Sequence, residues 1–92
     1  MNNLISIKTG TPSWYNAGSI TESFDSREML ERGEHPVAMV LKKAAEISQG
    51  EIYELITPFP PTPLIEKVRA MGFDSFSNQI SGNEVRTYFY KF

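Results

Sequence analysis

The chain has a single histidine, His35, and its neighbours make it a candidate binding residue. It directly precedes Pro36, and proline suits the first position of a helix because its missing N–H would have no partner there. The amino-terminal end of a helix carries a partial positive charge. Glu34 is adjacent, while Asp25 and Arg27 lie upstream at the end of a predicted strand. These residues predict a small polar site for an anion, a metal or a partner; alternatively, His35 only caps the helix.

A proline-rich segment, residues 58–63, is predicted to lie beside His35 as a rigid lip that carries Phe59. Ligands of α/β sheets often bind at the carboxyl ends of strands, where both segments are expected. Alternatively, the prolines only stiffen a strand-to-helix turn and Phe59 fills a gap. The predicted ligand- or partner-binding residues are Asp25, Arg27, Glu34, His35, Pro36 and Phe59.

Three aromatic residues of the last strand, Tyr88, Tyr90 and Phe92, are predicted to lie on the sheet face that the helices leave open. Aromatic side chains on such a face favour a protein interface, including one between two copies of the chain. The alternative is that the N-terminal arm folds over this face, with Trp14 and Tyr15 packed there.

The composition excludes several kinds of chemistry. The chain of 92 residues contains no cysteine and one histidine, and its formal net charge is -2. Without cysteine there is no disulfide, no thiolate nucleophile and no persulfide carrier, and one histidine is too few for a multi-histidine metal site. The acidic balance disfavours nucleic acid. We therefore predict no catalytic residue, no metal site, no cofactor and no nucleic-acid partner.

The hydropathy pattern predicts a cytoplasmic protein that does not enter a membrane. The longest unbroken aliphatic run covers residues 37–41, far short of the roughly 20 residues of a membrane helix. The N-terminal residues lack the basic and apolar segments of a signal peptide.

The order of elements predicts an α+β fold, namely a two-layer α/β sandwich. Strands are expected over residues 20–25, 52–56, 73–80 and 84–92, with helices over 36–48 and from Thr62 to Gly72. Asp25 and Glu28 have the spacing of a capping box before a short helical turn. Because βαβ crossovers are right-handed, both helices should cover one face of a four-stranded mixed sheet. Residues 1–18 are predicted to form an N-terminal arm, including a short edge strand at residues 4–7, and residues 19–92 the domain.

Several of these features together resemble the TusA/SirA-like family. They are Asp25-Ser26-Arg27, then Gly33-Glu34-His35-Pro36 opening a helix, and Pro58-Phe59-Pro60-Pro61-Thr62-Pro63-Leu64 leading into the second helix. The chain is most similar to an uncharacterised branch of that fold, with Gly-Glu-His-Pro in place of the family's Cys-Pro-x-Pro motif. The resemblance covers about residues 19–92 and implies the β-α-β-α-β-β fold.

The chain departs from the family at the residue that carries sulfur. His35 stands where the cysteine of the motif would be, and Ala38 replaces the second proline. An imidazole cannot hold a persulfide, so the resemblance does not imply sulfur transfer.

Three functions follow as hypotheses from the sequence. The first is a non-catalytic binding or accessory module that docks an unknown protein or small ligand at His35. The second is a metal- or redox-linked accessory enzyme that uses His35. The third is an assembly protein that acts through the open sheet face, as a monomer or a weak homodimer.

Overall fold

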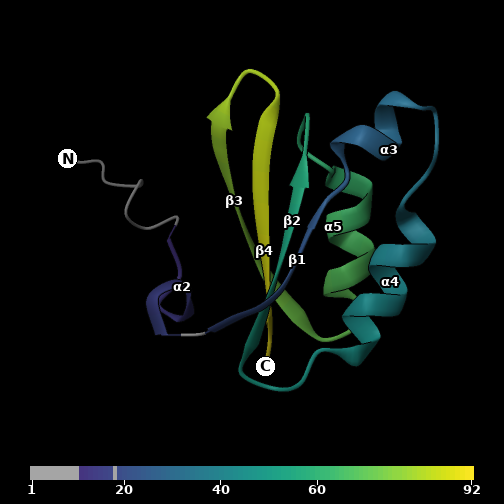
Figure 1. Ribbon diagram of the computed structural model, residues 1–92. Helices are drawn as coiled ribbons and strands as arrows, with labels where there is room; N and C mark the ends of the chain where they lie inside the picture. The colour runs from purple at the N-terminus through teal and green to yellow at the C-terminus, as the bar shows by residue number, and fades with distance from the viewer. Residues whose placement is uncertain (1–10, 18) are drawn as a thin grey trace.

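The computed structural model describes residues 11–17 and 19–92 (Figure 1). The strand predicted at residues 4–7 lies outside them. The described elements are, in chain order, α2 (Trp14–Ala17), β1 (Ser19–Asp25), α3 (Arg27–Glu31), α4 (Val37–Glu46), β2 (Glu51–Thr57), α5 (Thr62–Arg69), β3 (Phe73–Ser81) and β4 (Glu84–Lys91).

The four strands form one mixed sheet in the order β1-β2-β4-β3. β1 runs parallel to β2, while β4 is antiparallel to both β2 and β3. β3 and β4 form a hairpin in which Ser81 pairs with Glu84, so the turn is Gly82-Asn83. β1 and β3 are the edge strands.

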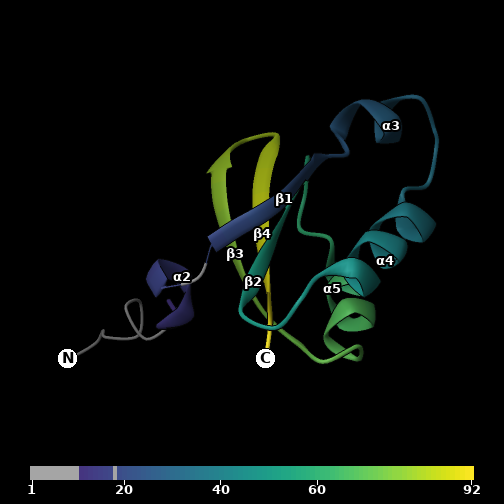
Figure 2. The same cartoon turned by 60° about the horizontal axis from the view of Figure 1, so that its bottom comes forward.

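Helices α4 and α5 lie together on one face of the sheet, as Figures 1 and 2 show. Both helices are amphipathic: Val40 and Ala44 of α4, and Leu64 and Val68 of α5, are buried. They pack on alternate strand residues, among them Tyr53, Leu55 and Phe89. The predicted two-layer sandwich is therefore confirmed.

The predicted capping box at Asp25 and Glu28 is wrong. Asp25 Oδ1 accepts its hydrogen bond from the Arg27 amide at 3.1 Å, two residues on instead of three. Glu28 pairs with Arg32 at 3.7 Å instead of reaching back. The physical reason is that the Arg27 guanidinium holds both Asp25 oxygens and that the N-cap of α3 is Ser26, not Asp25.

The starts of both long helices differ by one residue from the prediction. Helix α4 begins one residue later than expected, and helix α5 begins one residue earlier. Pro36 is the N-cap of α4, not its first helical residue, and Pro61 is the N-cap of α5. Thr62 was expected as the N-cap and is the first residue of α5. A proline can take either position because neither needs its N–H.

The second face of the sheet carries α2, which packs on the aromatic residues of β3 and β4. Trp14 stacks on Tyr90 with ring centroids 5.2 Å apart, and Tyr15 meets Tyr88 edge-on at 5.0 Å. The Trp14 indole also donates to Asp74 Oδ2 at 2.8 Å. This arrangement corresponds to the second of the two predictions for this face, in which Trp14 and Tyr15 of the N-terminal arm pack on it.

In the part of the chain that the structure describes, no helix is both long and apolar enough to cross a membrane.

Candidate functional site

The candidate site is an apolar groove of about 300 Å³ between the start of α4 and the start of α5. We call it the His35 groove. It is lined by Leu30, His35, Pro36, Val37, Thr57, Phe59, Pro61, Pro63 and Leu64. All but His35 and Thr57 present apolar side chains, so the groove suits an apolar group more than a charged one.

One wall of the groove is made by the turn between α3 and α4. Gly33 adopts a left-handed conformation, with φ of 80°, directly after the α3 C-cap. The Gly33 amide donates to the Leu30 carbonyl at 3.1 Å and the Glu34 amide to the Met29 carbonyl at 2.9 Å. This pair of hydrogen bonds is the Schellman arrangement that ends a helix sharply. It turns the chain so that both His35 and Pro36 line the groove.

The opposite wall is the proline-rich segment between β2 and α5. The Thr57 hydroxyl donates to the Phe59 carbonyl at 2.6 Å, which fixes the first bend. Pro61 is buried, whereas the Phe59 side chain stays 55% exposed. Four prolines restrict this backbone before any ligand arrives, so Phe59 is held out as an apolar lip at little further entropy cost.

Among the described residues that line the groove, none carries a carboxylate, an ammonium or a guanidinium group. The hydroxyl of Thr57, a polar residue of this lining, is already engaged with the Phe59 carbonyl. His35 is exposed at the rim. A ligand would therefore gain apolar contact from the walls and a polar contact from His35.

The predicted binding residues do not form one site. His35, Pro36 and Phe59 line the His35 groove. Asp25 and Arg27 line a separate hollow of about 380 Å³, together with Glu28, Glu31 and Asn83.

Glu34 lies at neither place. Its carboxylate accepts hydrogen bonds from the Arg32 guanidinium at 3.0 and 3.1 Å, which lowers the pKa of Glu34. Glu34 precedes His35 in the sequence, but its side chain is committed to a surface ion pair.

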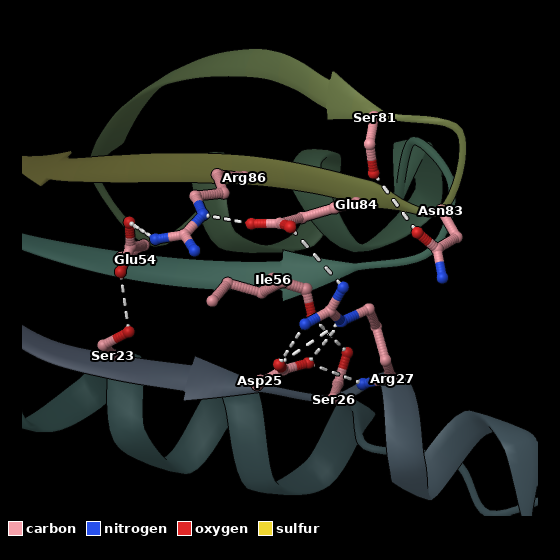
Figure 3. A network of polar contacts seen from close by, with 10 residues as sticks. All are labelled: Ser23, Asp25, Ser26, Arg27, Glu54, Ile56, Ser81, Asn83, Glu84 and Arg86. Carbon is pink, nitrogen blue, oxygen red and sulfur yellow. Dashed lines mark hydrogen bonds and ion pairs between the residues drawn. The ribbon is translucent and has the colours of Figure 1, made fainter.

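Asp25 and Arg27 belong to a chain of polar contacts that crosses the second face of the sheet (Figure 3). Arg27 Nη2 lies 2.7 Å from Asp25 Oδ2, and Arg27 Nη1 lies 3.6 Å from Glu84 Oε1. The hydrogen bonds from Arg27 hold the pKa of Asp25 below its usual value, and Asp25 in turn raises the pKa of Arg27. The Asp25 carboxylate and the Arg27 guanidinium thus form an ion pair with each other.

The same chain of contacts continues through Arg86 to Glu54 on β2. Arg86 donates to Glu84 Oε2 at 2.7 Å and to Glu54 Oε2 at 3.2 Å, and the Ser23 hydroxyl donates to Glu54 Oε1 at 2.7 Å (Figure 3). The Glu54 side chain is 10% exposed, so both carboxylate oxygens are bonded where water has little access. The network joins β1, β2 and β4.

Glu54 and Arg86 were not among the predicted site residues. The signal for Glu54 was a lone carboxylate in the middle of the apolar run 52–56. A charged residue at a buried strand position must have a partner.

Of the three residues of the predicted interface, Tyr88 and Tyr90 lie under α2, whereas Phe92 is more exposed than either. Tyr88 is buried, and burial raises its pKa. Tyr90 is half-buried beneath Trp14, whereas Phe92 is exposed. The structure thus places arm residues on two of the three aromatic side chains.

Among residues 11–17 and 19–92, no cluster of three or more histidine, aspartate or glutamate side chains could hold a metal ion.

No family model, curated protein or solved structure matches the chain.

Proposed function

We propose that the chain is a non-catalytic, TusA-like binding module of the cytoplasm, which takes an apolar segment of a partner protein into the His35 groove. The observation that carries the proposal is the apolar lining of this groove at the start of α4, with His35 at its rim and Phe59 as its lip.

The TusA/SirA-like resemblance supports this choice of position. In that family the functional residue directly precedes the proline that opens the first long helix, and here His35 precedes Pro36, the N-cap of α4. Because the chain contains no cysteine, this position is exposed to a partner but cannot carry sulfur. Binding without catalysis is the function that these residues can perform.

The exposed apolar side chains around the groove also support a protein partner. Phe59 is 55% and Val37 37% exposed, on two different walls. A buried apolar anchor commonly dominates the affinity of a protein interface. An apolar side chain of a partner that enters between these walls would exclude water from both.

The test is selection of a phage-displayed random peptide library on the full chain, followed by affinity measurement with the selected peptides. We expect the peptides to share an apolar anchor. Phe59→Ser should weaken their binding at least tenfold, and His35→Ala should weaken it severalfold. Ile80→Ser is the matched control, since Ile80 is exposed to a similar degree, 49%, but does not line the groove.

The proposal is overturned if the library yields no binder. It is equally overturned if the selected peptides bind Phe59→Ser and Ile80→Ser with the same affinity.

A further inference from the structure

The two edge strands of the sheet differ in how they are protected against pairing with another strand. β1 has an irregular register between Ile20 and Glu22, and its acidic residues pair with Lys43 and Arg27. β3 carries one charged residue, Asp74, and none from Ser75 to Ser81. Bulges and charges are the usual means by which an edge strand avoids another strand. β3 also has a register irregularity, but it lies between Gln79 and Ser81. Among the described residues, β3 is therefore regular and uncharged from Ser75 to Gln79, whereas β1 is irregular and carries paired acidic residues.

The hydrogen-bonding phase of β4 shows which backbone groups of β3 are free. The Gly50 amide, just before β2, donates to the Lys91 carbonyl at 2.8 Å, so Lys91 directs its backbone toward the β2 side. Because alternate residues of a strand direct their backbone groups to opposite sides, Tyr90, Tyr88 and Arg86 direct theirs toward β3.

The β3 partners of these three residues are Asp74, Phe76 and Asn78. The backbone groups of Ser75, Ser77 and Gln79 must then point away from β4. The Ser75 amide agrees, since it donates at 2.9 Å to the Asp74 side chain. The outer edge of β3 therefore presents alternating donors and acceptors around Ser77.

We propose that β3 pairs antiparallel with β3 of a second copy of this chain, about a two-fold axis at Ser77. In this register Ser77 exchanges both backbone hydrogen bonds with Ser77 of the second copy. Ser75 of each copy faces Gln79 of the other. The Ser75 amide then donates its hydrogen bond to the Gln79 carbonyl of the second copy instead of to the Asp74 side chain of its own chain. The result is a continuous eight-stranded sheet, an isologous interface of the kind most dimers use.

The charges and the surrounding elements permit this pairing. The two Asp74 side chains lie at opposite ends of the paired segment, so no like charges face each other. Trp14 and Tyr15 contact Asp74 and Phe76, near the start of β3. In Figures 1 and 2, no other described element flanks the outer side of β3 at its hairpin end. The residues from Ser77 to Ser81 are exposed.

The test is sedimentation velocity of the full chain from about 10 µM to 1 mM. We expect the average mass to rise with concentration from that of the monomer toward twice that value. Ser77→Lys and Ser77→Asp each place two like charges at the two-fold axis, and each should weaken association at least tenfold. An equimolar mixture of the two should associate again, because opposite charges then meet at the axis.

Two variants serve as controls. Ser77→Ala removes the Ser77 hydroxyl contact with Thr87, 2.9 Å in the structure, but leaves the backbone edge intact, so it should associate as the unmodified chain does. Thr21→Lys puts the same new charge on β1 and should also have no effect. The proposal is overturned if the chain stays monomeric at 1 mM, if either charged variant associates normally, or if the mixture fails to associate.

Discussion

The two faces of the sheet are held by different forces. The face beneath α4 and α5 is apolar, and Val40, Val68 and Phe89 are fully buried there. The opposite face joins its strands through the carboxylate of Glu54 and the guanidinium of Arg86, 3.2 Å apart. The helix-covered face excludes water, whereas the opposite face holds, besides the aromatic residues under α2, charges in partial contact with water.

The difference arises from alternation along the same strands. On β2, Tyr53 and Leu55 face the helices, and Glu54 between them faces the other way. Burial of apolar surface responds little to pH or salt, whereas exposed ion pairs respond to both. The two faces should therefore be separable by experiment, and the following predictions run from the largest effect to the smallest.

Truncation of the helix-covered face should have the largest effect. Phe89→Ala removes a fully buried ring that contacts Tyr53 and Phe73, and it should lower the free energy of unfolding by about 3–5 kcal/mol. The measurement is urea denaturation followed by far-ultraviolet circular dichroism. Phe92→Ala is the control, because that ring is 68% exposed. Equal losses for the two variants would contradict the assignment of the core to this face.

Removal of the carboxylate on the opposite face should have an intermediate effect. Glu54→Ala leaves the Ser23 hydroxyl and one nitrogen of Arg86 without their acceptor, and should lower the free energy of unfolding by about 1–3 kcal/mol. The loss should change little with salt, because the Glu54 side chain is 10% exposed and a partly buried ion pair is screened weakly. Glu66→Ala, on the exposed side of α5, is the control and should have no measurable effect. A loss no larger than that of Glu66→Ala would show that the hydrogen bonds of Glu54 do not stabilise the fold.

The acid dependence at Asp25 should be the smallest effect. Arg27 holds the folded-state pKa of Asp25 below the ordinary value of 3.8, so the carboxylate stabilises the fold above that pH. This contribution disappears as the pH falls through the folded value. The stability difference between the unmodified chain and Asp25→Asn should therefore narrow from pH 5 to pH 2, measured by urea denaturation at each pH. A constant difference would mean that the ion pair does not affect stability.

Most of the fold could be predicted from the sequence, because local patterns specify it. The apolar stripe from Val37 to Ile47 predicted a helix, and Ser81-Gly82-Asn83 predicted a hairpin loop. In the structure the turn is one residue shorter, because Ser81 pairs with Glu84. The alternation in the last strand assigned Phe89 to the helices and Tyr88 to the other face, as the structure has them.

The candidate site was less predictable because it depends on pairing between distant residues. His35 and Phe59 were expected at one end of the sheet, and the structure places both in one groove. Asp25 and Arg27 were grouped with His35 by closeness in sequence, yet they bind each other and Glu84, a residue of the last strand. Which arginine pairs with which carboxylate depends on the strand order, and the periodicity of a single chain does not specify that order.

The placement of Trp14 has a practical consequence for experiments on this molecule. It is the only tryptophan of the chain, and it stacks on Tyr90 while its indole N–H donates to Asp74. Its fluorescence therefore reports whether α2 is seated on the sheet, not whether the helices are packed. A denaturation curve read by tryptophan emission and one read by helical signal follow different events in this protein, and any gap between them measures how tightly the N-terminal segment is attached.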